Sequence, residues 1–187
     1  MKTTAHFAAI CWILFVMFWV ISAFSVKATQ ARQPWVGRLI YLWLGLVAAL
    51  LLTLRIGGAQ FNRSILPHTI AVGMLADVII AIGLSIAIWA RIVLGGNWSS
   101  RVALKEGHEL IQRGPYRAVR HPIYSGLLLM VLGTVLLAGR LVDFTALIIS
   151  FFGLWMKLRQ EELLLTKHLP GYAEYMTRTK ALIPFVL

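Results

Sequence analysis

Cysteine is almost absent from this sequence of 187 residues. The only one, Cys11, lies inside an apolar run. A single thiol cannot form an intrachain disulfide, a thiolate zinc cluster or a Cys-x-x-Cys redox pair. Functions that depend on paired or clustered cysteines in the chain are therefore excluded, and no metal site is predicted.

Charged residues are also scarce, at 13% of the chain, whereas hydrophobic residues make up 59%. A soluble domain of this length would be far less apolar. Because a membrane helix needs roughly 20 apolar residues, the chain has room for several crossings but little for a separate soluble domain. We predict one compact domain that lies in a lipid bilayer.

Acidic residues are few, with seven Asp and Glu against 18 Lys and Arg, so the formal charge is +11. A strongly basic chain can indicate a nucleic-acid-binding protein. Here, however, the basic residues flank apolar segments and form no stripe on a soluble fold. Membrane topology and anionic lipids explain the charge better, so no nucleic-acid partner is predicted.

Five uninterrupted apolar runs predict membrane helices. They cover Phe7 to Val26, Leu39 to Leu54, Thr69 to Ala90, Pro122 to Gly139 and Leu141 to Met156. The fold class predicted is therefore all-α, a polytopic transmembrane bundle of about five helices. The first run could instead be a signal peptide, since Lys2 precedes it, but its length and the lack of a clear cleavage site favour a retained helix.

The distribution of basic residues between these helices predicts the orientation of the chain. Lys2, Arg55, Arg63 and Arg140 fall on one side of the membrane, and all other Lys and Arg residues fall on the opposite side. Cytoplasmic loops carry the excess of Lys and Arg. We therefore expect the N-terminus outside and the C-terminus in the cytoplasm, with the polar segments Gly95 to His121 and Lys157 to Leu187 facing the cytoplasm.

The first polar segment ends in the motif GPYRAVRHPIY, residues 114–124. Pro122 is expected to begin the fourth helix, because proline is favoured at the first helical position. His121 then lies at the helix N-terminus, where free N–H groups and the positive end of the dipole suit a carboxylate. The alternative is that His121 only caps the helix while Arg117 and Arg120 solvate the interface.

The second polar segment begins with Lys157, Arg159, Glu161 and Glu162. Lys157 and Glu161 are four residues apart and share one helix face. Two adjacent carboxylates can form an interfacial ion-pair network. They can also form a site for a cationic ligand group, with Glu161 turned toward the bundle.

In combination, these motifs resemble the isoprenylcysteine carboxyl methyltransferase family and its phospholipid N-methyltransferase relatives. The resemblance spans Gly95 to Pro184 and is carried by motifs that occur in the same order. They are Gly95-Gly96-Asn97-Trp98-Ser99, Glu106 to Ile111, GPYRAVRHPIY with Gly126, the pair Glu161-Glu162, Tyr172, Tyr175 and Pro184.

The resemblance implies a methyltransferase that uses S-adenosylmethionine and receives a lipid-like or prenylated acceptor through the membrane. It divides the chain into N-terminal helices at residues 1–94 and a methyltransferase core at residues 95–187. The residues it implies at the cofactor site are His108, Leu110, Ile111, Tyr116, His121, Pro122, Tyr124 and Glu161.

The acceptor implied by the family is the carboxylate of an isoprenylcysteine. Arg120 and Lys157 are the candidates for holding it, unless both serve only as positive-inside residues. Where the carboxyl methyltransferases have an arginine one turn before the glutamate, this chain has Lys157, which lacks the bidentate fork that matches a carboxylate. If the acceptor is an amine, a base is needed, and Glu162 is the nearest candidate.

Three other interpretations remain open. The enzyme could be a phospholipid or small-amine N-methyltransferase, or more distantly an NADPH-dependent sterol-type reductase, since such reductases have a similar His-Pro-x-Tyr block. A scaffold without catalytic activity is the third. The pair Glu161-Glu162 favours a cationic cofactor over one with several phosphates. Outside the resemblance, Asp77 lies inside the third predicted helix, where we expect a structural role.

Overall fold

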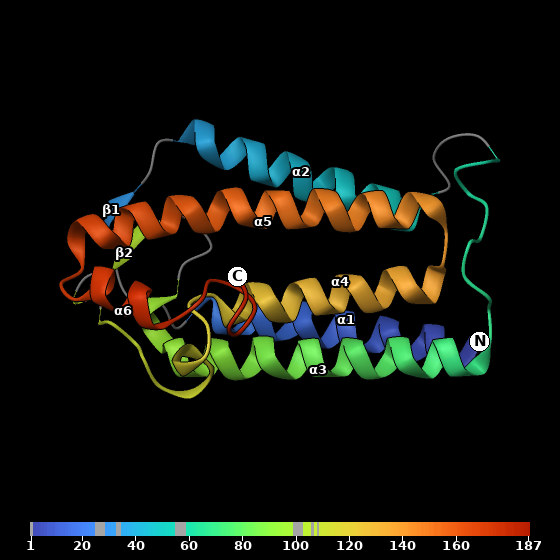
Figure 1. Ribbon diagram of the computed structural model, residues 1–187, viewed down its shortest axis with the longest axis horizontal. Coiled ribbons are helices and arrows are strands. Elements are labelled where there is room, and N and C mark those ends of the chain that lie inside the picture. The colour runs from blue at the N-terminus through green and yellow to red at the C-terminus, as the bar shows by residue number, and fades with distance from the viewer. Residues whose placement is uncertain are drawn as a thin grey trace.

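The computed structural model describes residues 2–24, 29–32, 35–54, 59–98, 103–105, 107 and 109–187. Five long helices run side by side in an up-and-down bundle, with a short helix at one end (Figure 1). The α-helices are α1 (Lys2–Ser22), α2 (Trp35–Thr53), α3 (Ile70–Leu94), α4 (Pro122–Ala138), α5 (Leu141–His168) and α6 (Tyr172–Arg178). Two 3₁₀ turns, η1 (Gly95–Asn97) and η2 (Gly114–Arg117), and two strands, β1 (Thr29–Arg32) and β2 (Ala103–Lys105), connect them.

The predicted helical membrane bundle is confirmed. In the described part of the chain, three helices are long and apolar enough to cross a membrane, namely Thr3–Ser22, Ile70–Asn97 and Leu141–His168. Two shorter apolar helices, Leu39–Thr53 and Pro122–Ala138, lie beside them. Together they account for the five apolar runs of the sequence, and the chain is an integral membrane protein.

Several predicted boundaries are wrong. The first helix begins at Lys2 and ends at Ser22, and does not reach Val26. The fifth helix does not end at Met156 but continues to His168. Its last three turns are rich in charged residues yet keep helical geometry, because straight-chain residues such as Leu, Glu, Lys and Gln are good helix formers. Helix α5 therefore extends beyond the apolar layer and carries its charged turns toward α6.

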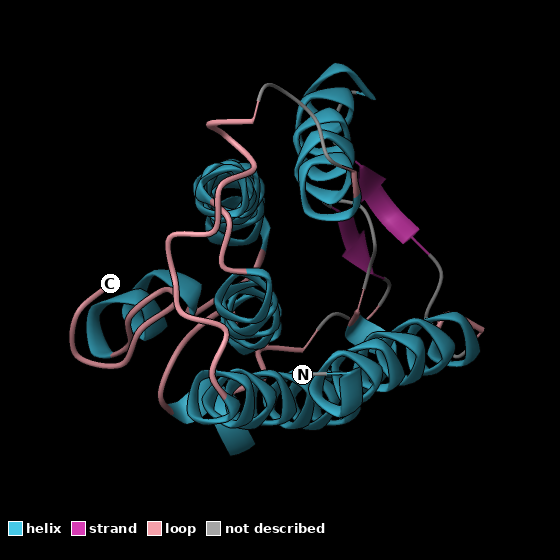
Figure 2. Cartoon of the chain, turned by 90° about the vertical axis from the view of Figure 1, so that its right-hand side faces the viewer, coloured by secondary structure: helices cyan, strands magenta, loops and turns pink. Residues whose placement is uncertain are grey.

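The short sheet and α6 lie outside what the apolar pattern predicted. Strands β1 and β2 pair antiparallel, with Thr29 opposite Lys105 and Arg32 opposite Ala103. They lie near the end of the bundle that carries α6, and Figure 2 shows them beside the helices. This pairing joins the segment after α1 to the segment after α3.

Helices α3 and α4 form the closest helix pair, and glycines allow their backbones to touch. A Cβ atom on Gly126 would lie 2.5 Å from the carbonyl oxygen of Gly83, and one on Gly83 would lie 2.5 Å from the oxygen of Gly126. Two helical turns further along α4, a Cβ on Gly133 would lie 2.7 Å from Ala76 O. Small residues of this kind let membrane helices approach closely.

The far end of the bundle, opposite α6, is held by Arg140. This residue caps α5, where its backbone N–H and guanidinium bind the Asp143 carboxylate. The same guanidinium donates to the carbonyl oxygens of Leu51 and Leu52 at the end of α2, both at 3.1 Å. The N-terminus of the chain lies at this end, far from the start of α4 (Figure 1).

Candidate functional site

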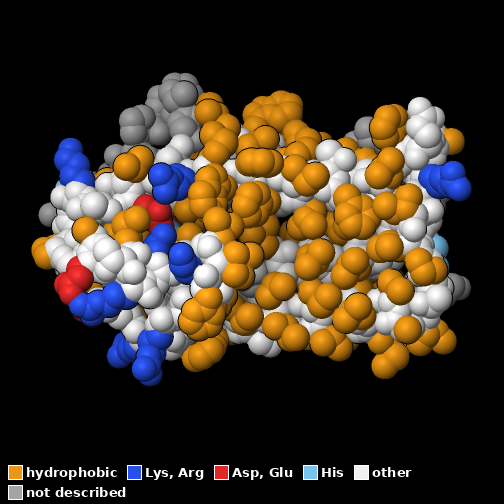
Figure 3. Space-filling model, in the orientation of Figure 1, with side chains coloured by type: hydrophobic (Ala, Val, Ile, Leu, Met, Phe, Trp, Pro, Cys, Tyr) orange, Lys and Arg blue, Asp and Glu red, His pale blue; other side chains and the backbone are white. Residues whose placement is uncertain are grey.

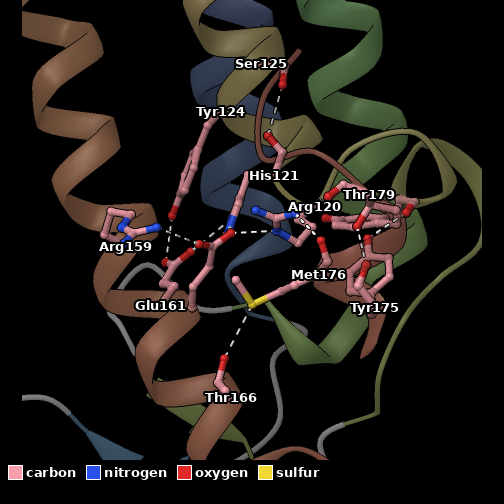
Figure 4. A network of polar contacts seen from close by, with 12 residues as sticks. Arg120, His121, Tyr124, Ser125, Arg159, Glu161, Thr166, Tyr175, Met176 and Thr179 are labelled. Atoms are coloured by element: carbon pink, nitrogen blue, oxygen red, sulfur yellow. Dashed lines mark hydrogen bonds and ion pairs between the residues drawn. The ribbon is translucent and has the colours of Figure 1, made fainter. Parts of the chain in front are cut away.

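The N-terminus of α4 has the geometry that the sequence predicted. Pro122 is the first helical residue and is fully buried, and His121 is the N-cap residue. The His121 side chain makes no capping hydrogen bond. It is buried and faces the two glutamates of α5 across the bundle (Figure 4). The alternative that His121 only caps the helix is therefore not supported, because the capping hydrogen bond is missing.

Glu161 joins α5 to the first turn of α4. Its Oε1 accepts a 2.7 Å hydrogen bond from the Tyr124 hydroxyl, and its Oε2 lies 3.7 Å from His121 Nδ1. The rings of His121 and Tyr124 are stacked, with centroids 5.5 Å apart and planes 5° from parallel. One carboxylate is thus fixed in position by a phenol and an imidazole.

Glu162 and Arg120 form a second, more deeply buried contact. Arg120 Nε donates to Glu162 Oε1 at 2.6 Å, and its Nη1 donates to the carbonyl oxygens of Met176 and Thr179. The Glu162 side chain is only 4% exposed. Its Oε2 atom and His121 Nε2 have no hydrogen-bond partner among the described residues, although His121 Nε2 lies 3.4 Å from Glu162 Oε1. This cluster ties α5 to the C-terminal segment.

A pocket lies between the start of α4, the end of α5 and the segments around them. The empty space of the pocket, counted together with the open space at its mouth, is about 810 Å³. Most of its wall is apolar or aromatic, with a few polar groups. The lining residues are Leu94, Asn97, Trp98, Glu109, Leu110, Ile111, Tyr116, Arg120, His121, Ile123, Tyr124, Glu161, Leu164, Leu165, Leu169, Tyr172 and Tyr175.

Three tyrosines outside the membrane helices stay neutral in this wall. Burial raises the pKa of Tyr116 and of Tyr172 far above the ordinary value for a phenol, and nearby glutamates add to both shifts. Burial also raises the pKa of Tyr175 to about 12. The Tyr175 hydroxyl donates a 2.6 Å hydrogen bond to the carbonyl oxygen of Tyr116, which joins α6 to η2. These rings therefore give the pocket rigid aromatic surfaces.

Most of the residues predicted for the site come together at this pocket. The predicted residues that line it are Leu110, Ile111, Tyr116, Arg120, His121, Tyr124 and Glu161. Pro122 and Glu162 are buried behind the wall. His108 lies outside the described residues.

Lys157 lies one helical turn from Glu161, on the side of the pocket toward the membrane. Its Nζ is 4.0 Å from Glu161 Oε1, 5.2 Å from the ring centroid of Tyr124 and 5.7 Å from that of Tyr41 on α2. Two aromatic faces and a carboxylate therefore surround the ammonium group. The predicted shared face of Lys157 and Glu161 is confirmed.

Several lining residues had no role in the sequence-based prediction. Leu164 and Leu165 follow Glu161 by three and four residues, so helical spacing identifies them once α5 is known to continue. Asn97 and Trp98 belong to a motif of the family resemblance but carried no assignment. In the described part of the chain, no group of three or more His, Cys, Asp or Glu side chains is arranged to hold a metal ion.

Comparison with known proteins identifies the family of the chain. The model of the isoprenylcysteine carboxyl methyltransferase (ICMT) family matches residues 74–167, half of the chain, from α3 through α5. A probable protein-S-isoprenylcysteine O-methyltransferase of Oryza sativa subsp. indica is 33% identical over 115 residues, covering 58% of this chain and 59% of the relative.

Two bacterial relatives are similar over a longer stretch. The cobalt-zinc-cadmium resistance protein CzcN of Cupriavidus metallidurans is 26% identical over 147 residues, 78% of this chain. The nickel-cobalt-cadmium resistance protein NccN of Alcaligenes xylosoxydans xylosoxydans has the same identity over the same length. The alignments cover 63% and 64% of these relatives. On the match to its family model, the chain belongs to the isoprenylcysteine carboxyl methyltransferase family.

Proposed function

We propose that this protein is a membrane methyltransferase that binds S-adenosylmethionine in the pocket between α4 and α5. The observation that carries the proposal is the Glu161 carboxylate, which faces an apolar and aromatic pocket and is held there by Tyr124 and His121. A carboxylate in such a place suits a ligand with a cationic group and a large aromatic part. Membership of the family supports the same conclusion.

The residues of the pocket fit the proposed cofactor part by part. Glu161 can accept hydrogen bonds from an ammonium or from ribose hydroxyls. The N-terminus of α4 at His121 and Pro122 favours a carboxylate, and the His121 side chain lines the pocket at this point. Leu110, Ile111 and Tyr116 offer apolar and aromatic surface for a base.

When bound, S-adenosylmethionine supplies an electrophilic methyl group on a sulfonium. The protein then has to align the acceptor with that group and exclude water, since in-line displacement by an ionised carboxylate needs little acid-base chemistry. The apolar wall of the pocket excludes water. The stacked rings of His121 and Tyr124 align the acceptor.

Lys157 is the best candidate for contact with the acceptor. It lies beside the pocket on the membrane side, between α5 and Tyr41 of α2. An acceptor that arrives from the lipid reaches this side first. The substrate that the family favours is the carboxylate of an isoprenylcysteine-type molecule, and the Lys157 ammonium can pair with it.

Arg120 and Glu162 were predicted to act in catalysis, Arg120 by holding the acceptor and Glu162 as a base. Both remain candidates, but they are engaged with each other and with the C-terminal segment. We therefore assign them first a positioning role. Because the pair links Thr179 to α5, it fixes the positions of the His121 and Glu161 side chains.

An N-methyltransferase that acts on a phospholipid or small amine is the second candidate. It is favoured by the surroundings of Lys157, whose charge is already balanced by Glu161 and two tyrosine rings. One experiment separates the two. Membranes that contain the protein are incubated with methyl-labelled S-adenosylmethionine and candidate lipids, and the products are treated with base. Volatile label indicates a methyl ester, retained label an N-methyl group, and the absence of any label transfer would contradict both.

The proposed orientation puts the pocket in the cytoplasm, where S-adenosylmethionine is made. Most of the Lys and Arg side chains on the face in Figure 3 gather at the end of the molecule that carries α6, next to a broad apolar region, and a smaller basic patch lies at the opposite end. This distribution supports a cytoplasmic C-terminus and an N-terminus on the other side.

A further inference from the structure

Residues Ile183–Val186 form a compact loop whose apolar side chains are exposed. Phe185 is 96% exposed, Val186 71% and Ile183 50%. The residues on either side of this tip are anchored, since Leu182 is buried and Leu187 packs against the cluster of Tyr124, Leu158 and Leu182. The loop is thus held firmly at its base while its apolar tip points outward.

Part of the backbone of this loop is hydrogen-bonded within the loop itself. The N–H groups of Leu182 and Ile183 donate to Leu187 O, at 2.7 and 2.8 Å, and those of Val186 and Leu187 donate to Ile183 O, both at 3.1 Å. Pro184 has no N–H. The Phe185 N–H and the carbonyl oxygens of Pro184, Phe185 and Val186 have no backbone partner among the described residues. Since backbone groups without partners are not tolerated in the hydrocarbon layer, the tip of the loop suits the hydrated headgroup region.

Phe185 adopts a backbone conformation that is unfavourable for its residue type. Its φ of 65° is the only positive φ of a non-glycine residue in the described part of the chain. Such strain in a bulky residue points to a function for its side chain. Glycine would adopt this conformation without strain but would have no side chain. With phenylalanine at this position, an aromatic ring points away from the protein.

The position of the loop identifies those surroundings. His121 N donates to Ala181 O at 3.0 Å and Ser125 Oγ donates to Leu182 O at 2.6 Å, so the base of the loop lies beside the first turns of the membrane helix α4. The exposed cations Arg178 and Lys180 precede it in the chain. An apolar tip next to basic residues, level with the start of a membrane helix, matches the boundary between lipid headgroups and acyl chains.

We propose that the loop Ile183–Val186 inserts into the interfacial layer of the bilayer and that Phe185 is its main anchor. The surface of this loop is then an attachment site for lipid. The loop is also connected to the pocket, because the same C-terminal segment binds Arg120, His121 and Ser125 at the start of α4. Contact with lipid at this loop would hold that wall of the pocket in place, whatever reaction the pocket supports.

Spin labelling tests the proposal directly, since Cys11 is the only native cysteine. The full-length Cys11→Ala protein with Phe185→Cys is spin-labelled and reconstituted in vesicles of phosphatidylcholine and phosphatidylglycerol. Collision rates of the label with oxygen, which enriches in lipid, and with a water-soluble nickel chelate are then measured. Labels at Glu174→Cys on the exposed face of α6 and at Ile148→Cys on the exposed face of α5 serve as the aqueous and membrane controls.

The ratio of oxygen to nickel collisions at position 185 should exceed that at 174 several-fold and lie between the values at 174 and 148. A ratio equal to that at 174 would overturn the proposal. So would a label shielded from both reagents with dipolar coupling to a neighbouring label, because that outcome would mean that a second copy of the chain covers the loop. Val186→Cys, measured in the same way, keeps the test valid if the substitution of Phe185 impairs folding.

Discussion

The Tyr124 hydroxyl donates a 2.7 Å hydrogen bond to Glu161 Oε1 and so links the first turn of α4 to the charged turns of α5. The two residues are far apart in the sequence, and their contact forms one side of the pocket. The other oxygen of Glu161 faces His121 at 3.7 Å, and the Lys157 ammonium lies 4.0 Å from Oε1, so the carboxylate is held in place from three sides.

Replacing Glu161 tests its place in the pocket. Glu161→Gln should weaken binding of S-adenosylmethionine by about 1.5–3 kcal/mol, the typical cost of losing a hydrogen bond to a charged group, while the protein stays folded. Calorimetry on purified protein measures the dissociation constant. Glu174→Gln, on the exposed pair with Arg178, is the matched control and should change nothing. An unchanged constant for Glu161→Gln would remove this residue from the site.

Lys157 and His121 are expected to affect different ligands. Lys157→Ala should leave the affinity for S-adenosylmethionine nearly intact but lower turnover or acceptor affinity, and His121→Ala should weaken cofactor binding by about 1–3 kcal/mol. Lys157→Arg restores a bidentate fork and should improve a carboxylate acceptor but not an amine. Lys167→Ala, on the exposed end of α5, is the control. A parallel loss of both affinities in both alanine variants, with folding intact, would contradict this division.

The Arg120–Glu162 pair should matter for stability. Glu162→Gln removes the negative charge that faces the buried Arg120 guanidinium at 2.6 Å, and breaking a buried ion pair typically costs about 3–5 kcal/mol. Combining it with Arg120→Met should cost less than the sum of the single changes, as measured by unfolding in detergent. The exposed pair Glu174–Arg178 gives the comparison, since loss of a surface pair costs about 0–1 kcal/mol. Strict additivity at Arg120 and Glu162 would show that they do not interact.

Gly126 tests the close packing of α3 on α4. Gly126→Ala puts a Cβ within 2.5 Å of Gly83 O, so the helices must separate, at a cost of about 1–3 kcal/mol. Gly45→Ala is the control, because a Cβ on Gly45 meets nothing within 4 Å. There alanine should be neutral or stabilise α2 by up to about 1 kcal/mol. Equal melting temperatures for the two variants in detergent would contradict the packing.

The orientation of the chain is open to a direct test. A fluorescent protein that folds only in the cytoplasm should be bright when fused to the C-terminus and dark when fused to the N-terminus, because most Lys and Arg residues belong to the segments on the C-terminal side of the membrane. A periplasmic phosphatase reporter should give the opposite pattern. A C-terminus found outside would also contradict the proposed cofactor, which is cytosolic.

Much of the fold was predictable because apolar runs of membrane length leave few alternatives. The start of α4 was also predictable from Pro122, since its missing N–H and fixed φ suit the first helical position. The end of α5 was missed because hydropathy reports the apolar layer, not the helix, and the helix runs on to His168. The strands were missed because Thr29–Arg32 and Ala103–Lys105 are short, and their pairing joins segments far apart in the sequence.

The site was predictable only in part. The motif around His121 and the pair Glu161-Glu162 could be recognised from their residues, but no local pattern states that Tyr124 would bind Glu161 or that Arg120 would bind Glu162. Those contacts depend on the register between α4 and α5. The contribution of Asn97 and Trp98 depends likewise on α3 packing against α4, and that of Tyr172 and Tyr175 on α6 folding back to η2.

The glycine contacts between α3 and α4 have a mechanical consequence for the pocket. With Gly83 and Gly126 in backbone contact, the two helices can neither slide nor approach further without steric overlap. Asn97 and Trp98 at the end of α3 and His121 and Tyr124 at the start of α4 therefore move as one rigid slab. Any change in the width of the pocket has to come from the opposite side, by a swing of the charged end of α5 about its Arg140 anchor.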